Sequence, residues 1–255
     1  MHKRVEALQK VLIGNRPLFE DLVKRRFIYG PSAEIYGGSA GLFDYGPLGA
    51  GIKNNLVNRW RKDFVIAEDI FEMSCASLTP AAVLRSSGHT DRFSDFMVRD
   101  LSSGEALRAD HLLEEITTRE INKPDCASSR RAELEALRAS AGGLRTSKSF
   151  DEALASAGAK GISPSFEVNL MVEARLGPAG EHRAFLRPET AQSIFCNFRK
   201  LLDLAGGKLP FGAAMVGPAF RNEVAPRNGL VRLREFEMAE VEFFVDPKST
   251  SHPRL

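Results

Sequence analysis

Apolar residues recur at every fourth position in one segment of the chain: Leu48, Ile52, Leu56, Trp60 and Phe64. Residues at this spacing share one side of an α-helix, and polar residues such as Lys53 and Arg59 fill the positions between them. The pattern predicts an amphipathic helix over residues 48–64. A run of residues typical of a β-strand follows, from Ile70 to Leu78, and ends before Pro80.

A second pattern, near the C-terminal end, alternates with a period of two. Two stretches typical of β-strands flank residues 224–229, in which Asn228-Gly229 is a strong turn signal. Successive side chains of a strand point to opposite faces. One face of the second stretch therefore carries Arg232, Arg234, Phe236, Met238, Glu240 and Glu242. The pattern predicts an antiparallel hairpin over residues 220–242, with arginine, glutamate and phenylalanine interleaved on one surface.

The remaining patterns divide the chain into parts. Residues 1–24 predict a basic amphipathic helix that leads into the domain, and acidic residues near it argue against a transit peptide. Residues 25–122 and 166–247 have the mixed pattern of a folded core. Residues 123–165 are rich in Ala, Ser, Arg, Gly and Glu, so we expect an insertion that is helical or loosely ordered rather than core. Residues 248–255 are expected to form a tail.

Composition narrows the class of protein only in part. The 255 residues are 43% hydrophobic and 27% charged, which is ordinary for a folded protein. The formal net charge of +2 neither indicates nor excludes a nucleic-acid partner. Cys75, Cys126 and Cys196 stand far apart, which is typical of reduced thiols in an intracellular protein and not of a disulfide frame or zinc site. No apolar run approaches the roughly 20 residues that span a bilayer, so we expect no membrane partner.

The interleaved surface of the predicted hairpin suits a nucleotide. Arginine donates to phosphate oxygens and neutralises charge that builds as pyrophosphate leaves. An aromatic ring with a guanidinium opposite can sandwich a purine, and a carboxylate can accept from its exocyclic amine. A solvated strand face held by cross-strand ion pairs has the same composition. Spacing alone leaves both interpretations open.

Sequence blocks beyond the spacing favour the nucleotide site. The run FRNE at residues 220–223, followed by a short loop and RLREFEMAEVE, resembles motif 2 of class II aminoacyl-tRNA synthetases of the glycyl type. The helix over residues 48–64 with its following strand resembles motif 1, the dimer-forming element. SGHTDRFSDFMV, LRADHLL, FLRPETAQSIF and KLPFGAAMVG match further blocks in the same order, closest to the eukaryotic and archaeal branch.

This resemblance implies an α+β fold, with an antiparallel sheet flanked by helices, in a chain that we expect to stop before motif 3 and the anticodon-binding domain. It also implies ATP-dependent activation of glycine to glycyl-adenylate and transfer to tRNA(Gly). The implied ATP contacts are Arg221, Asn222, Glu223, Arg232, Leu233 and Phe236. Among them, Arg221 is implied to hold the α-phosphate and Glu223 the adenine amino group, as the catalytic pair.

The amino-acid site is implied by other blocks. Glu189 and Glu240 match carboxylates that pair with the glycine ammonium and exclude larger side chains, and Arg108 matches the residue that meets the substrate carboxylate. Arg227, in the hairpin loop, is expected to contact the tRNA acceptor end. Mg²⁺ is expected to accompany ATP, with no protein metal ligand in this chain. The resemblance further implies a homodimer through motif 1 and a cytoplasmic location, with which a mitochondrial form is compatible.

Two alternatives stay open at this stage. One is a catalytically inactive class II-like module that binds or assists another protein, since a fold alone does not establish activity. The other is a class II enzyme for another small amino acid. Ser193 and Met215 stand where the family's blocks usually carry glycine and glutamine, so pocket packing is expected to differ, although every charged group named above is retained.

Overall fold

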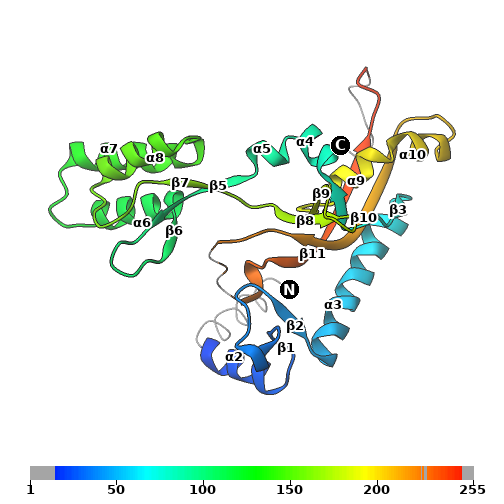
Figure 1. Cartoon of the computed structure of the whole chain (residues 1–255), viewed down its shortest axis with the longest axis horizontal. Helices are drawn as coiled ribbons and strands as arrows, with labels where there is room; N and C mark the ends of the chain where they lie inside the picture. The colour runs from blue at the N-terminus through cyan, green and yellow to red at the C-terminus, as the bar shows by residue number, and fades with distance from the viewer. Residues whose placement is uncertain (1–14, 225, 227–228, 249–255) are drawn as a thin grey trace. The chain divides into compact units, whose positions relative to one another are not determined.

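A computed structural model describes residues 15–224, 226 and 229–248 of the chain. Helices and small, mostly antiparallel sheets alternate along it, which confirms the predicted α+β class (Figure 1). The described residues divide into two compact units. The first contains the residues before 80, residues 186–221 and those after 225, and the second contains residues 80–185 and 222–224. No helix among the described residues is long and apolar enough to cross a membrane.

The first unit begins with helix α2 (Arg16–Arg25) and the two-stranded sheet of β1 (Tyr29–Pro31) and β2 (Phe43–Tyr45). A single 3₁₀ turn, η1 (Glu34–Tyr36), lies between the strands. Glycine is required where this segment approaches the next helix, because a Cβ on Gly46 would lie 1.7 Å from the carbonyl oxygen of Phe27. Most of the predicted N-terminal helix lies outside the described residues.

Helix α3 (Pro47–Trp60) confirms the first predicted helix, and a π-helical turn, η2 (Arg61–Ile66), extends it. Its apolar stripe is not buried within the described chain. Leu48, Ile52 and Leu56 are 57%, 56% and 70% exposed. The predicted strand that follows is divided into β3 (Phe71–Met73) and β4 (Leu78–Pro80).

The central sheet of the first unit has the order β11-β10-β3. Strand β10 (Phe211–Phe220) pairs antiparallel with β11 (Glu235–Phe244) and parallel with β3. Helices α9 (Ala191–Cys196) and α10 (Phe198–Leu204) pack on this sheet. The core between them consists of Ile194, Leu201, Phe211, Ala213 and Met215.

The predicted hairpin is confirmed, but its connection is longer than a tight turn and runs from residue 221 to residue 234. Arg232 and Arg234 therefore precede β11 instead of lying in it, and a 3₁₀ turn, η4 (Gly229–Val231), comes just before them. The cause is that the main chain on both sides of the connection bonds elsewhere. The N–H of Asn222 donates to the Leu170 carbonyl at 2.7 Å, and the N–H of Arg234 donates to the Gly41 carbonyl at 2.8 Å.

The second unit contains two small cores. In one, helices α4 (Ala81–Ser86) and α5 (His89–Arg92) accompany strands β8 (Val172–Leu176) and β9 (His182–Leu186), around Leu84, Met171 and Phe185. In the other, the sheet β6-β5-β7 shares a core with the helices that follow it, around Val98, Leu113 and Leu154. Its strands are β5 (Ser94–Arg99), β6 (Ala106–Arg108) and β7 (Phe166–Asn169).

Residues 123–165 supply more of this second core than their composition indicates. They form α7 (Ser128–Ser140), the turn η3 (Ala141–Gly143) and α8 (Ser147–Ala157), which pack with α6 (Ala109–Ile121) (Figure 1). The buried apolar residues of the segment are Leu134, Phe150, Ala153, Leu154 and Ala157. Small residues suffice for a core where helices pack closely. Whether residues 123–165 act as a separate insertion stays a prediction.

Candidate functional site

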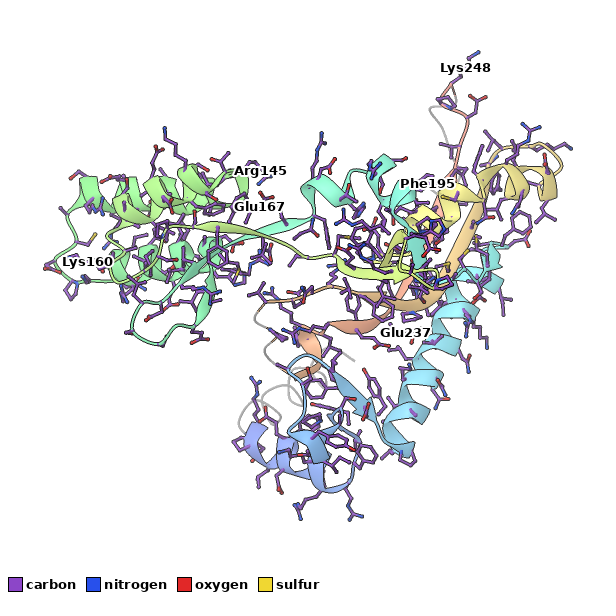
Figure 2. All side chains as sticks on the ribbon, viewed as in Figure 1. Arg145, Lys160, Glu167, Phe195, Glu237 and Lys248 are labelled. Carbon is purple, nitrogen blue, oxygen red and sulfur yellow. The ribbon has the colours of Figure 1, made fainter. Side chains whose placement is uncertain are left out.

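The face of β11 predicted from alternation carries Phe236, Met238, Glu240 and Glu242. The strand register places Glu240 opposite Met215 and Glu242 opposite Ala213 of β10. On the other face, Glu237, labelled in Figure 2, accepts a hydrogen bond from Lys53 of α3 at 2.9 Å. The carboxylates of the first face are thus separated from the ion pair that links β11 to α3.

A buried arginine anchors the loop between β9 and α9. Arg187 is 3% exposed, and its guanidinium donates to the carbonyl oxygens of Pro218 at 2.7 Å and Cys75 at 2.9 Å. Burial lowers the pKa of Arg187. Gly217 is required beside it, because a Cβ there would lie 2.4 Å from Nη2 of the arginine. These contacts fix the start of the loop that carries Glu189.

The same loop joins the two carboxylates predicted to read glycine. The main-chain N–H of Thr190 donates to Oε2 of Glu240 at 2.7 Å, and the hydroxyl of Thr190 donates to the same oxygen. Thr190 is fully buried. Glu189, its neighbour, accepts a hydrogen bond from Nε2 of Gln192. The structure therefore brings Glu189 and Glu240 to one place in the first unit.

Glu242 is a third carboxylate at this place. Burial raises the pKa of Glu242, and the neighbouring charges of Glu240 and Glu189 raise it further. Three carboxylates that repel one another are best relieved by a cation that can donate hydrogen bonds to them. The arrangement suits a small ammonium group.

Arg221 lies between this loop and β11. Its Nε donates to the Pro188 carbonyl at 3.3 Å, and its guanidinium carbon lies 5.3 Å from the centre of the Phe236 ring. The main-chain N–H of Arg221 donates to the Arg234 carbonyl at 2.9 Å. Two of the predicted ATP contacts, the arginine and the aromatic ring, are therefore adjacent.

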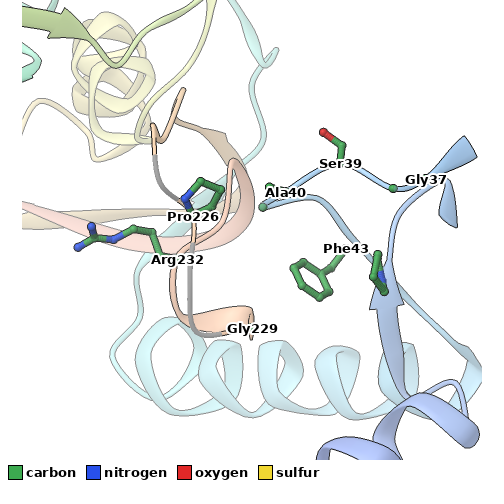
Figure 3. Close-up of a pocket in the computed structure, with 10 residues that line it drawn as sticks. Gly37, Ser39, Ala40, Phe43, Pro226, Gly229 and Arg232 are labelled. Atoms are coloured by element: carbon green, nitrogen blue, oxygen red, sulfur yellow. The ribbon is translucent and has the colours of Figure 1, made fainter. Parts of the chain in front are cut away.

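Arg232 lines a separate cavity of about 400 Å³ within the first unit. The cavity lies between the hairpin connection, with Pro226 and Gly229, and the glycine-rich segment that joins β1 to β2, with Ser39 (Figure 3). Phe43, the first residue of β2, also lines it. Arg234 ties the two sides together, because its Nη1 donates to the Ala40 carbonyl at 3.0 Å. Leu233, a predicted ATP contact, is only 7% exposed.

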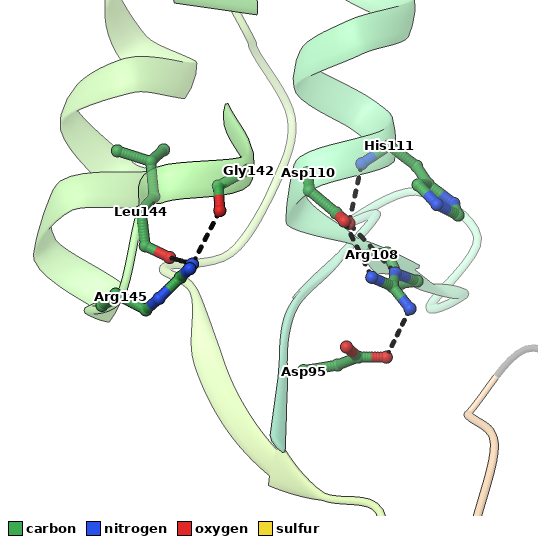
Figure 4. A network of polar contacts seen from close by, with 7 residues as sticks. All are labelled: Asp95, Arg108, Asp110, His111, Gly142, Leu144 and Arg145. Atoms are coloured by element: carbon green, nitrogen blue, oxygen red, sulfur yellow. Dashed lines mark hydrogen bonds and ion pairs between the residues drawn. The ribbon is translucent and has the colours of Figure 1, made fainter. Parts of the chain in front are cut away.

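Arg108 lies in the second unit within a network of acidic partners (Figure 4). Asp110 holds its Nε and Nη2 at 3.0 and 2.8 Å, and Asp95 holds its Nη1 at 2.7 Å. The hydrogen bonds with Asp110 are the main cause that raises the pKa of Arg108, and the charge of Glu223 contributes. The guanidinium is already bound by two carboxylates of its own chain.

The predicted site residues are thus distributed over both units. Glu189, Arg221, Arg232, Phe236 and Glu240 belong to the first unit. Arg108, Asn222 and Glu223 belong to the second. Arg227 lies outside the described residues. No group of three or more His, Cys, Asp or Glu side chains in the described part of the chain could hold a metal ion.

Sequence reasoning missed several residues of the site: Arg187, Thr190, Gln192 and Glu242. Glu242 shares the alternating face of Glu240, so the period of two already indicated it. The other three lie inside the block RPETAQ, in which only the glutamate was singled out. Nothing in the local pattern indicates that Thr190 bonds to a strand 50 residues later in the sequence.

Comparison with known proteins relates the sequence of this chain to a protein family. Residues 172–253 match the tRNA synthetase class II core domain (G, H, P, S and T). The chain is 44% identical over 243 residues to the glycine–tRNA ligase of Caenorhabditis elegans, covering 93% of this chain and 33% of that protein. It is 42% identical over 259 residues to the glycine–tRNA ligase of Drosophila melanogaster, covering 99% of this chain and 34% of that protein.

A solved structure agrees at the level of the fold. The RNA-binding domain of threonyl-tRNA synthetase from Cryptosporidium parvum superposes with a TM-score of 0.50 at 16% identity, covering 89% of this chain and 36% of that one. The chain spans about a third of the length of the two curated relatives named above.

Proposed function

We propose that the chain belongs to the class II aminoacyl-tRNA synthetases and is the part of a glycine–tRNA ligase that binds ATP and glycine and forms glycyl-adenylate. The observation that carries the proposal is the group of carboxylates formed by Glu189, Glu240 and Glu242. Such a group suits an amino acid that offers an ammonium and no side chain. Ligase activity of the whole protein is part of this proposal.

In the proposed reaction the glycine carboxylate attacks the α-phosphorus of ATP, an oxygen–phosphorus bond forms, and pyrophosphate leaves. The protein forms no covalent bond, so it acts by positioning and by stabilising charge. Arg221 neutralises the charge that builds on the α-phosphate, and Arg232 supports the phosphates. Phe236 stacks on the adenine, whose amino group donates to Glu223. Asn222 and Leu233 complete the proposed ATP contacts.

The contact between Arg221 and Phe236 constrains how adenine binds. Stacked carbon atoms are separated by about 3.5–4 Å, so a purine between the two groups needs roughly 7 Å. The observed separation of 5.3 Å is smaller. Adenine binding therefore requires Arg221 to turn away from the ring, toward the phosphates, or the purine to stack on the other face of Phe236.

Glycine is selected in this proposal by Glu189 and Glu240. Their carboxylates bind the ammonium and occupy the volume that a β-carbon would need. Arg108 meets the substrate carboxylate only if that carboxylate competes with Asp95 and Asp110, which bind the guanidinium at 2.7 and 2.8 Å.

The partners of the reaction follow from the same proposal. ATP enters as its Mg²⁺ complex, and tRNA(Gly) accepts the glycyl group, with Arg227 at its acceptor end. The exposed stripe of α3 supports a homodimer, because an apolar helix face is stabilised when a second copy covers it. We propose a cytoplasmic location, and a mitochondrial form is compatible with the same residues.

The test is glycine-dependent ATP–pyrophosphate exchange by the purified chain, alone and with the C-terminal part of a glycine–tRNA ligase added in trans. Exchange that requires glycine supports the proposal. Absence of exchange in both settings contradicts it and favours an inactive binding or accessory module. Exchange that is equal with alanine or serine instead favours an enzyme for another small amino acid, and it refutes the role given to Glu189 and Glu240.

A further inference from the structure

In the side-chain amide of Gln192, in α9, the nitrogen has a hydrogen-bond partner and the oxygen has none. Its Nε2 donates to Oε1 of Glu189. Its Oε1 is buried without a hydrogen-bond partner, and no other buried side-chain nitrogen or oxygen in the described part of the chain lacks one. Buried polar atoms are nearly always paired in folded proteins. The exception indicates a donor that arrives with a ligand.

Glu189 fixes which way the amide points. An ionised carboxylate only accepts hydrogen bonds, so the amide NH₂ must face it, and a flipped amide would set two acceptor oxygens against each other. The amide oxygen lies about 2.2 Å from its nitrogen by covalent geometry. A cation bound to Glu189 is therefore within reach of the oxygen of Gln192.

The groups around this amide favour a cationic donor. Glu189 contacts the amide directly, and Glu240 is held one residue further along the loop by Thr190. Glu242 adds a third carboxylate near both. The main-chain N–H and the hydroxyl of Thr190 already occupy one oxygen of Glu240. A neutral donor would leave this negative charge unrelieved, whereas an ammonium relieves it.

We propose that Oε1 of Gln192 accepts an N–H from the α-ammonium of the amino-acid substrate, which makes Gln192 a specificity-determining residue of the glycine pocket. The inference rests on the proposed function. It raises the number of side chains that accept hydrogen bonds from the substrate ammonium from two to three. A primary ammonium has three N–H groups, and Glu189, Glu240 and Gln192 provide one acceptor for each. An N-methylated amino acid has one N–H fewer and leaves one acceptor unpaired.

The experiment measures binding by calorimetry, so it does not depend on turnover. The purified chain is titrated with three stable compounds: glycyl-sulfamoyl-adenosine, its N-methylglycyl counterpart, and sulfamoyl-adenosine without an amino acid. Gln192→Met keeps the length of the side chain and removes its hydrogen bonds. Asn197→Leu is the matched control, because it removes an amide on the neighbouring turn whose Nδ2 donates to the Ser193 carbonyl at 2.9 Å.

We expect the unsubstituted chain to bind the glycyl compound roughly 10- to 100-fold more tightly than the N-methyl compound, the effect of one hydrogen bond to a charged donor. In Gln192→Met this preference should fall below about threefold, while Asn197→Leu should keep it. An unchanged preference in Gln192→Met overturns the inference and leaves the proposed function standing. If the unsubstituted chain binds the glycyl compound no better than sulfamoyl-adenosine, the proposed function fails, and the inference with it.

Discussion

At the scale of single residues, the site depends on groups that hold the carboxylates in place. Arg187 is a buried charge whose guanidinium donates to two main-chain carbonyl oxygens of other segments. Thr190 fixes Glu240 with two hydrogen bonds to one oxygen. A buried polar group is tolerated only when it is paired, so substitutions at these contacts are expected to be costly.

Gly217 provides the simplest test of the packing around Arg187. Gly217→Ala places a Cβ 2.4 Å from Nη2 of the arginine, so we expect a loss of about 1–3 kcal/mol in the free energy of unfolding. Gly51→Ala in α3 is the control, because a Cβ at this position would meet nothing within 4 Å. This substitution should stabilise the helix by about 0.5–1 kcal/mol. Urea denaturation measures both. Equal stability of Gly217→Ala and the unsubstituted chain would show that the side chain of Arg187 has room to move away from residue 217.

Glu242 gives a prediction about pH. Its pKa is raised above 4.5 in the folded chain, so the folded state binds the proton more tightly than the unfolded state. The free energy of unfolding therefore falls as pH rises from 4.5 through the folded pKa. Glu242→Gln should be more stable than the unsubstituted chain at neutral pH, and the difference should vanish in acid. Thermal melts across this range measure it.

Asp100 is the contrasting case for that experiment. The Ser102 hydroxyl and the N–H groups of Ser103 and Ser102 lower the pKa of Asp100 to about 2. The ionised Asp100 therefore contributes to the free energy of unfolding at pH values above the ordinary aspartate pKa of 3.8, and this contribution is lost as the pH falls through about 2. Asp100→Asn should therefore be less stable at neutral pH, the opposite sign to Glu242→Gln. A stability change of the same sign for both substitutions would refute the opposite directions given to the two pKa shifts.

At the scale of elements, the local sequence pattern predicted the type and position of helices and strands well, but it did not predict which segments they contact. The four-residue spacing located α3 correctly, since Pro47–Trp60 is helical, yet it could not indicate that Leu56 would be 70% exposed. Alternation identified the face of β11 from Phe236 onward. It placed Arg232 and Arg234 in the strand as well, which is wrong, because β11 begins at Glu235 and the N–H of Arg234 donates to the Gly41 carbonyl. Contacts between distant segments do not appear in a local pattern.

Helices α7 and α8 allow a test at this scale. Leu134 is fully buried, so Leu134→Ala should lower the free energy of unfolding by about 2–5 kcal/mol. Leu101→Ala, at a leucine that is 68% exposed in the same unit, should change it by less than about 0.5 kcal/mol. Urea denaturation followed by circular dichroism distinguishes them. A neutral Leu134→Ala would contradict the packing of α7 in this core and favour the loosely ordered alternative for residues 123–165.

At the scale of the whole molecule, the exposed stripe of α3 and the ionic link on the far face of β11 concern assembly. Lys53 of α3 pairs with Glu237 at 2.9 Å, so the helix is tied to the sheet that carries the carboxylates. A partner that covers Leu48, Ile52 and Leu56 would therefore support the site indirectly. Sequence similarity implied this dimer, and the exposure of the stripe is an independent reason to expect it.

Substitution within the stripe tests the dimer. Leu56→Asp introduces a charge at an exposed apolar position, so we expect it to shift the chain toward monomer without changing its circular dichroism spectrum. Asn55→Asp adds the same charge at an adjacent position of α3 that lies outside the stripe, and it should leave association unchanged. Sedimentation at micromolar concentrations measures both. Monomeric sedimentation of the unsubstituted chain would contradict the proposed dimer.

The central claim is that the carboxylates around Thr190 select an amino acid with no side chain. Calorimetric titration of the purified chain with glycyl-sulfamoyl-adenosine and alanyl-sulfamoyl-adenosine tests it most directly, because the two compounds differ by one methyl group. A single methyl group is worth about 1–3 kcal/mol in a close-fitting pocket, so we predict that the glycyl compound binds roughly 10- to 200-fold more tightly. Equal affinity for the two compounds, or binding of neither, would contradict the account.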